Sequence, residues 1–153
     1  MKKQGFTLIE LMVVIVIMGI LAAVAVPKLF GMIAKSKASE VPTAAGTWVN
    51  LMDAYAAEKS AVGSWSEIGY EAPGTMNSAK TSSTTSVIGY QDGTSGDYRT
   101  WTATAKNALN DCTGSWSLKA AATATNVTVE DNNSDGNCLA LTPNWNALYR
   151  SGS

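Results

Sequence analysis

The sequence contains no histidine, and only 15% of its 153 residues are charged. Lys and Arg number 11 against 12 Asp and Glu, so no excess of positive charge indicates a nucleic-acid-binding surface. The lack of histidine removes the commonest general acid or base. No nucleophile–base pair, phosphate-binding glycine loop or zinc-ligand spacing is apparent in the sequence. We therefore expect neither an enzyme nor a nucleic-acid site.

Charged residues are also absent from one long run near the N-terminus, Leu11 to Val26, which directly follows Glu10. A helix over the 21 residues from Phe6 to Val26 would be about 30 Å long, the thickness of one hydrocarbon core. A charge in such a helix costs about 2.5–3.5 kcal/mol, so it is rare and usually functional. Cleavage after Gly5 would give Phe6 a free amino group, which is a suitable counter-ion for the Glu10 carboxylate.

The residues around this run form a specific pattern. Met1 to Gly5 is a short basic leader ending in Gly, Phe-Thr-Leu-Ile-Glu occupies positions 6–10, and Pro27 follows the apolar run. The pattern resembles the type IV pilins and the related pseudopilins of type II secretion, over about one fifth of the chain. In this family the leader is removed after the Gly and the new N-terminal residue is methylated. The resemblance therefore implies cleavage after Gly5 and N-methylation of Phe6.

Three further residues have roles that follow from this resemblance. The carboxylate of Glu10 is expected to set the assembly register by pairing with the Phe6 amino group of an adjacent subunit. Gly19 and Pro27 weaken the helix between them, which would help it move from lipid into a filament. An ordinary signal peptide is the alternative interpretation, because Ala23-Val24-Ala25 satisfies the small-x-small cleavage pattern. Glu10 at the start of the apolar run argues against that alternative.

The rest of the chain predicts an α+β fold like that of pilins. Beyond Pro27 the helical pattern becomes amphipathic, and Gly63 is expected to end it. The stripe that repeats at helical spacing consists of Val41, Ala44, Ala45, Trp48, Leu51, Met52, Tyr55 and Ala56. We expect this stripe to pack on a small antiparallel sheet. The predicted organisation is a leader (1–5), a transmembrane and filament-core helix (6–26), the amphipathic half of the spine helix (27–63), and a globular αβ-loop and sheet region (64–153).

The sheet itself is predicted from alternating residues and turn signals. Thr75 to Ser86 is rich in Thr and Ser and is interpreted as a surface loop. Turns are expected at Asp92-Gly93, Ser95-Gly96, Thr113-Gly114 and Asp135-Gly136. The predicted strands are Ser86 to Gln91, Asp97 to Ala105, Ser115 to Lys119 and Thr123 to Glu130, with a fifth candidate at Cys138 to Leu141.

The two cysteines, Cys112 and Cys138, lie in the part that would be exported, where disulfides persist. We predict that they form a bridge, with two buried free thiols as the alternative. Asp131, Asn133 and Asp135 fit the opening of a calcium loop, D-x-N-x-D-G, but ordinary hairpin turns use the same residues. The twelfth position of that loop is Thr142, where an EF-hand has Glu.

Two of the five tryptophans, Trp65 and Trp145, lie in loop-like contexts. If exposed, they would be surface aromatics able to stack on sugar rings; covering a sheet edge or a neighbouring subunit is the commoner use of such residues. The other three, Trp48, Trp101 and Trp116, fit helix or strand faces and are expected in the core.

The predicted function is that of a structural subunit of a type IV pilus, a homo-oligomeric helical filament for adhesion or twitching motility. Its expected partners are a prepilin peptidase, the pilus assembly machinery and inner-membrane lipid, and its expected location is the inner membrane before assembly and the cell surface after it. No cofactor is expected apart from the calcium candidate. The alternatives are a type II secretion pseudopilin, a minor pilin, and a carbohydrate-binding surface protein with a pilin-like anchor.

Overall fold

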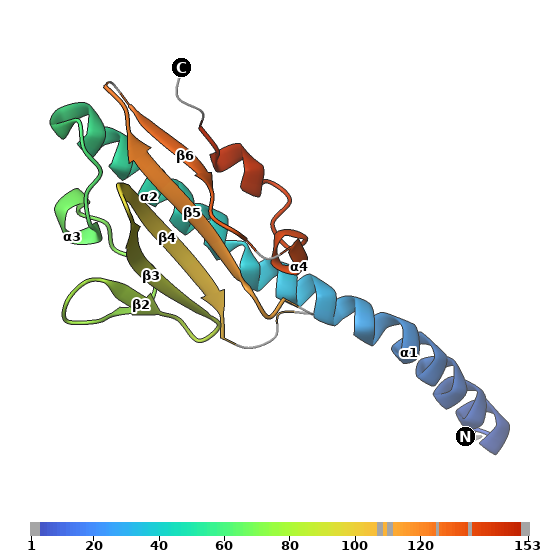
Figure 1. Cartoon of the computed structure of the whole chain (residues 1–153). Coiled ribbons are helices and arrows are strands. Elements are labelled where there is room, and N and C mark those ends of the chain that lie inside the picture. The colour runs from blue at the N-terminus through green and yellow to red at the C-terminus, as the bar shows by residue number, and fades with distance from the viewer. Residues whose placement is uncertain (1–3, 107–108, 110–111, 125, 135, 151–153) are drawn as a thin grey trace. The chain divides into compact units, whose positions relative to one another are not determined.

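The computed structural model describes residues 4–106, 109, 112–124, 126–134 and 136–150. The chain divides into two compact units, and the boundary lies between Ile33 and Ala34. Each unit is described by itself. Figure 1 shows the chain coloured from the N-terminus to the C-terminus with the elements labelled.

Most of helix α1, which runs from Leu8 to Ala38, forms the first unit. Pro27 lies inside this helix, and every residue from 4 to 30 is exposed. The helix is apolar and long enough to cross a membrane, as the sequence predicted. Exposure of a fully apolar helix to water is unfavourable. We therefore expect this segment to lie in lipid or against another protein surface.

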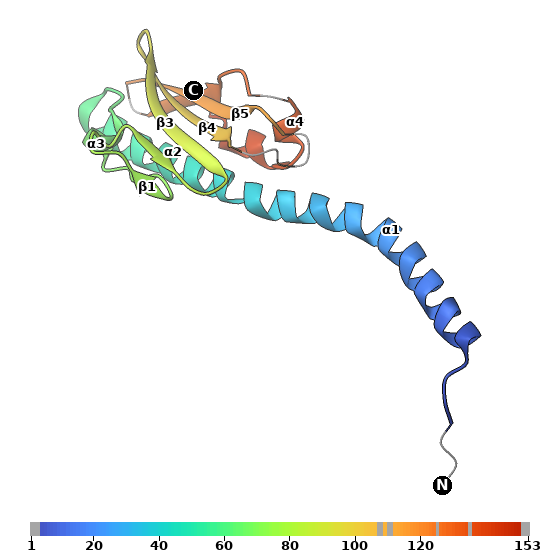
Figure 2. The ribbon, with the colours of Figure 1, turned by 90° about the horizontal axis from the view of Figure 1, so that it is seen from below.

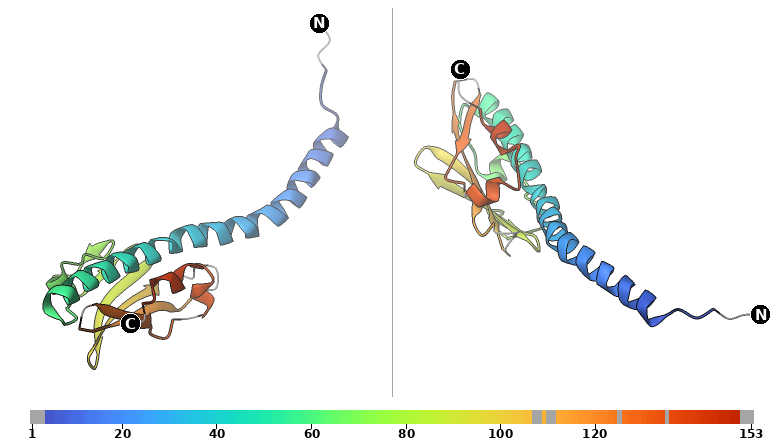
Figure 3. Two further views of the ribbon diagram at one scale, coloured as in Figure 1. Left: turned by 90° about the horizontal axis from the view of Figure 1, so that it is seen from above. Right: turned by 90° about the vertical axis from the view of Figure 1, so that its right-hand side faces the viewer.

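Helix α2, Glu40–Lys59, begins the second unit together with the last turn of α1. Seven of its residues are buried and face the sheet: Val41, Ala44, Ala45, Trp48, Val49, Met52 and Ala56. This face confirms the predicted amphipathic stripe, in which Leu51 and Tyr55 prove to be only partly buried. Figures 2 and 3 show α2 lying along one face of the sheet, so that helix and sheet form two layers.

The helix ends at Lys59 and not at the predicted Gly63. Ser60 adopts the left-handed conformation, with φ 52°, and its N–H donates to the Ala56 carbonyl. Gly63 is buried beyond that end, where a Cβ atom would lie 2.9 Å from the Tyr55 ring. The glycine therefore permits close packing and does not cap the helix.

The sheet is a six-stranded antiparallel meander in which each strand pairs with its neighbour in sequence. Its strands are β1 Thr75–Met76, β2 Ser82–Thr84, β3 Ile88–Ser95, β4 Tyr98–Ala105, β5 Ser115–Ala122 and β6 Val127–Asp131. A short helix, α3 (Trp65–Ile68), lies between α2 and β1. The predicted α+β architecture, with a helix packed on an antiparallel sheet, is confirmed.

Three further local predictions are wrong. The Thr- and Ser-rich stretch from Thr75 to Ser86 contains β1 and β2, because Thr75 pairs with Thr84 to form an extra hairpin. Asp92-Gly93 is no turn but lies within β3, where Gly93 pairs with Thr100. The fifth strand candidate, Cys138 to Leu141, overlaps a short helix, α4 (Gly136–Leu139).

The C-terminal segment closes the core. A 3-10 helix, η1 (Trp145–Leu148), contacts α2, and the backbone of Arg150 bridges to Val129 of β6. The Arg150 guanidinium forms an ion pair with Asp53 and donates to the side chain of Asn50 at 3.2 Å. These contacts join the last described residue to the middle of α2.

Buried tyrosines connect the two layers. Trp101 donates its indole N–H to the Tyr70 hydroxyl at 3.0 Å, and that hydroxyl donates to the Ala44 carbonyl of α2 at 3.1 Å. Burial raises the pKa of Tyr70 to about 12. Tyr90 of β3 donates to the Glu40 carboxylate at 2.8 Å, and burial, followed by this hydrogen bond, raises the pKa of Tyr90. Both tyrosines therefore remain neutral donors at physiological pH.

Candidate functional site

The predicted cleavage point lies in an accessible segment. Residues 4–7 precede α1 outside any helix or strand, and all are exposed. Among the described residues, no atom outside Gly5 and its two chain neighbours lies within 4 Å of the position of a Cβ on Gly5, and Phe6 is 96% exposed. A protease can therefore approach the Gly5–Phe6 bond without unfolding any described element.

The start of α1 is a capping box formed by Thr7 and Glu10. The backbone N–H and the hydroxyl of Thr7 donate to the Glu10 carboxylate at 2.7 and 2.8 Å. The Glu10 N–H donates to the Thr7 hydroxyl oxygen at 3.3 Å. This reciprocal pairing satisfies donors at the helix N-terminus that have no partner within the helix. The carboxylate thus has partners within its own chain before any subunit arrives.

Sequence reasoning assigned no role to Thr7, although Thr7-Leu8-Ile9-Glu10 has the T-x-x-E spacing of a capping box before an apolar run. The predicted pairing of Glu10 with the Phe6 amino group of an adjacent subunit involves a second, cleaved copy and stays a prediction. The same holds for the roles of Gly19 and Pro27 in a filament. Both residues lie within the uninterrupted helix α1, and a Cβ on Gly19 would meet no atom within 4 Å.

The predicted disulfide between Cys112 and Cys138 is confirmed. Their Cα atoms are 4.6 Å apart, and both residues are fully buried. Cys112 precedes β5, and Cys138 lies in α4. The bridge therefore ties the C-terminal segment to the sheet, as the sequence suggested.

The calcium candidate is described only in part, because Asp135 lies outside the described residues. The Asp131 carboxylate accepts hydrogen bonds from the backbone N–H and the hydroxyl of Ser134, and Asn133 has a positive φ of 63°. This is the geometry of a polar turn that follows β6. Among the described residues no three Asp, Glu, His or Cys side chains gather in a way that suits a metal ion. Calcium binding stays a prediction.

The prediction that Trp65 and Trp145 are surface aromatics is wrong. Trp65 is 0% exposed and Trp145 is 1% exposed, so neither can stack on a sugar ring in this subunit. Trp65 is the first residue of α3 and packs edge-on against Tyr70, with the ring centroids 5.0 Å apart. The ring centroids of Trp145 and Trp101 are 6.2 Å apart. Both occur in short helical segments that look like loops in the sequence but cover the core.

Comparison with known proteins concerns the N-terminal segment. The family described as the prokaryotic N-terminal methylation motif matches residues 1–26. The chain is 49% identical over 59 residues to the type IV major pilin protein PilA of Myxococcus xanthus, covering 39% of this chain and 24% of that protein. It is 46% identical over 57 residues to the fimbrial protein EcpC of Eikenella corrodens, which is 37% of either chain.

The type II secretion system core protein G of Vibrio cholerae is also similar, with 44% identity over 59 residues, 39% of this chain and 40% of that protein. The chain thus spans between a quarter and two fifths of the length of these curated relatives. No solved structure matches the chain.

Proposed function

Because this chain has the N-terminal segment of the type IV pilin family, we propose that it is a structural subunit of a type IV pilus. The observation that carries the proposal is the N-terminal segment itself. Its residues from 4 to 30 are all exposed, and most of them lie within the N-terminal methylation motif that matches residues 1–26. Such an apolar helix needs lipid first and neighbouring copies of itself afterwards.

The proposed precursor is held in the inner membrane by α1, with residues 1–5 as a leader. A prepilin peptidase cleaves the accessible Gly5–Phe6 bond, and Phe6 is N-methylated. The assembly machinery then brings subunits together through their N-terminal helices, and the filament displays the globular domain outside the cell. The buried Cys112–Cys138 bridge suits this oxidising location. The role is structural and requires no cofactor, and the filament would serve adhesion or twitching motility.

A type II secretion pseudopilin is the second candidate, and the similarity to core protein G of Vibrio cholerae favours it. The disulfide favours a pilin, since the family resemblance implies that major secretion pseudopilins usually lack one. The third candidate, a carbohydrate-binding surface protein, loses its motivating observation because Trp65 and Trp145 are buried.

The test is to shear surface filaments from cells that express the chain and to identify their subunits by mass spectrometry. We expect this polypeptide as an abundant component that begins with N-methylated Phe6. Its absence from sheared filaments, together with loss of protein secretion in a deletion strain, would establish the pseudopilin candidate instead. Trace abundance beside another dominant pilin would indicate a minor pilin.

A further inference from the structure

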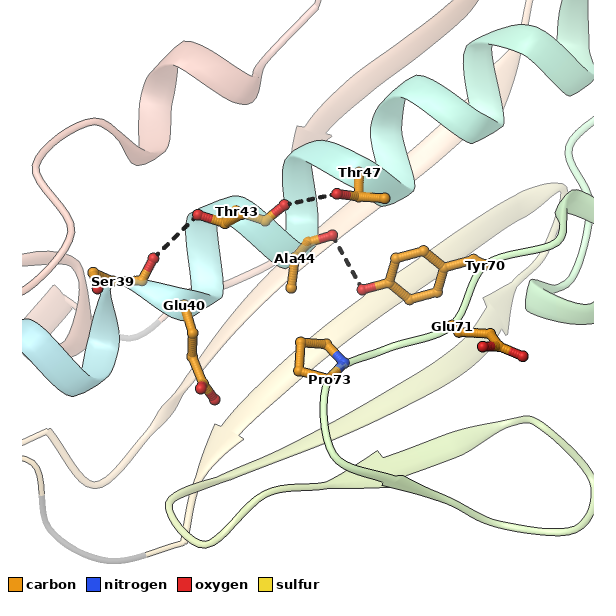
Figure 4. A pocket seen from close by; sticks show the side chains of 8 residues that line it. All are labelled: Ser39, Glu40, Thr43, Ala44, Thr47, Tyr70, Glu71 and Pro73. Atoms are coloured by element: carbon orange, nitrogen blue, oxygen red, sulfur yellow. Dashed lines mark hydrogen bonds between the residues drawn. The ribbon is translucent and has the colours of Figure 1, made fainter.

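A shallow groove of about 330 Å³ lies on the globular domain, between α2 and the segment that follows α3. Thr43, Ala44 and Thr47 line it from α2, and Tyr70 and Pro73 line it from the opposite side. Figure 4 shows the Thr43 and Thr47 side chains in a row along the helix, with Tyr70 and Pro73 across from them. All of these residues belong to the second unit.

Most residues that line the groove are polar, but the atoms that they present to an occupant are largely apolar. Thr43 donates its hydroxyl to the Ser39 carbonyl, and Thr47 donates to the Thr43 carbonyl at 3.1 Å. Because these hydroxyls are bonded to the backbone of their own helix, their methyl groups are left for a partner. The Tyr70 hydroxyl is likewise occupied by Ala44 and Trp101. An occupant therefore meets mostly carbon along the groove.

One end of the groove carries a fixed negative charge. Glu40 is held in place because its Oε1 accepts hydrogen bonds from Tyr90 at 2.8 Å and from Thr85 at 3.2 Å. Within the described part of the chain Glu40 forms no ion pair. The other acid of the groove, Glu71, is paired with Lys80 at 3.4 Å. A long aliphatic side chain with a cationic end fits this combination, since lysine packs its methylenes on apolar surface while its ammonium stays polar.

The same chain offers such a side chain at Lys35. This residue is exposed in the last turn of α1 and, among the described residues, has no acidic partner. Ser39 keeps helical angles, with φ −64° and ψ −18°, so the helical count continues from Lys35 to Glu40. Five residues correspond to about 140° around the helix, so Lys35 and Glu40 of one chain point in different directions. An ion pair between Lys35 and Glu40 would therefore form between two copies of the chain.

We propose that the groove receives the Lys35 side chain of a second copy of this chain, which pairs with Glu40. This inference rests on the proposed filament function. In the proposed filament each copy gives its Lys35 to one neighbour and receives Lys35 from another, so the contact is heterologous. A heterologous contact repeats from copy to copy and produces an open helical assembly when its rotation does not close. The groove is thus one half of a head-to-tail contact.

The first experiment is crosslinking within filaments. Two tagged populations are co-expressed with the untagged chain, one carrying Lys35→Cys and the other Thr43→Cys, and filaments are treated with a short bismaleimide. The described native cysteines are both in the disulfide and do not react. We expect dimers that carry both tags. Lys37→Cys replaces Lys35→Cys in the matched control, because Lys37 lies about 160° away from Lys35 around the helix.

The outcomes separate this inference from the function. Filaments that contain the chain but yield no mixed dimer overturn the groove contact and leave the pilus function standing. A mixed dimer from the Lys37 control but not from Lys35 also overturns it. Absence of the chain from surface filaments overturns the function and this inference together.

The second experiment removes charge without removing packing. Glu40→Gln keeps an oxygen for Tyr90 and Thr85, and Glu71→Gln changes a neighbouring charge that already has a partner. We expect filaments with Glu40→Gln to release subunits at a several-fold lower salt concentration, while Glu71→Gln filaments behave like the unsubstituted ones. The thermal midpoint of the isolated subunit reports any loss of folding. Equal salt resistance of the two variants would overturn the proposal.

Discussion

The two units of this chain place the same kinds of side chain in opposite environments. Nearly all large hydrophobic residues that the structure describes as exposed lie between Phe6 and Ile33, and Tyr98 is the exception. From Ala34 onward, Val, Ile, Trp and Met side chains form a closed core instead. The first unit is therefore held by its helical backbone hydrogen bonds and the Thr7–Glu10 capping box, whereas the second is held by tertiary packing. Changes in the first should affect processing and assembly, and changes in the second should affect folding.

The largest expected effect is a change at Gly5 in the first unit. Replacing Gly5 by a bulky residue such as Phe should abolish processing, because a side chain then fills the open space beside the scissile bond. An uncleaved precursor should accumulate in the membrane, and its globular domain should resist protease as before. N-terminal mass spectrometry is the measurement. A mature protein that begins at Val26 would mean that the segment is an ordinary signal peptide.

The next effect concerns Glu10, where two variants separate charge from capping. Glu10→Val removes both, and Glu10→Gln removes the charge but keeps a side chain that can complete the capping box with Thr7. Both variants should insert into the membrane at least as well as the unsubstituted chain, because the cost of about 2.5–3.5 kcal/mol for the charge is gone. Both should form few or no filaments when surface material is sheared and quantified.

Normal filaments from Glu10→Gln but not from Glu10→Val would show that the cap matters and the charge does not. Normal filaments from both would remove Glu10 from the assembly mechanism.

Loss of the disulfide tests the second unit. Cys112→Ser should lower the free energy of unfolding of the globular domain by roughly 2–5 kcal/mol. Insertion and cleavage after Gly5 should be unchanged, since the first unit contains neither cysteine. Limited proteolysis and thermal melts measure the effect. A variant that melts like the parent but is no longer cleaved would contradict the division into two independent units.

The smallest effect is expected from alkaline pH, which acts through buried tyrosines. The folded pKa of Tyr70 is about 12, above its ordinary value of 10.0. The neutral phenol is thus favoured by folding, and its stabilising contribution is complete below pH 10 and is lost as the pH rises towards 12. Tyr70→Phe should cost about 1 kcal/mol at neutral pH, because the hydrogen bonds to Ala44 and Trp101 disappear. Unfolding followed by Trp fluorescence should depend less on pH in this variant.

Residues 8–33 contain no tyrosine, so their helical circular dichroism in detergent should remain unchanged over the same pH range. An equal loss of helix in both units would contradict the assignment of the effect to the core.

The sequence predicted those features that depend on periodicity or on a specific motif. The spacing of Val41, Ala44, Trp48 and Met52 indicated the buried face of α2, and Trp101 and Ala103 alternate with exposed or partly exposed threonines in β4. The two cysteines indicated the bridge, because an exported domain with an even number of cysteines favours one.

The features that were missed depend on tertiary contacts. The Thr75–Thr84 hairpin is polar, so no hydrophobic alternation marks it, and it forms because β3 presents an unpaired edge to β2. Trp65 and Trp145 lie in helical segments of four residues each, too short to show a period. Asp92-Gly93 has turn chemistry, but pairing with Trp101 and Thr100 keeps it extended. In each case contacts with residues elsewhere in the sequence determine the local structure.

The contacts of Arg150 have a consequence for the timing of folding. In the meander every strand pairs with its sequence neighbour, and such local contacts form quickly. Arg150 and Asn50, in contrast, are 100 positions apart, and Arg150 also pairs with Asp53 on α2. In the proposed export across a membrane, these contacts can form only when α2 and Arg150 lie on the same side of the membrane. In the proposed export the sheet can begin to fold during translocation, but the domain is complete only after both α2 and the segment that ends at Arg150 have crossed the membrane.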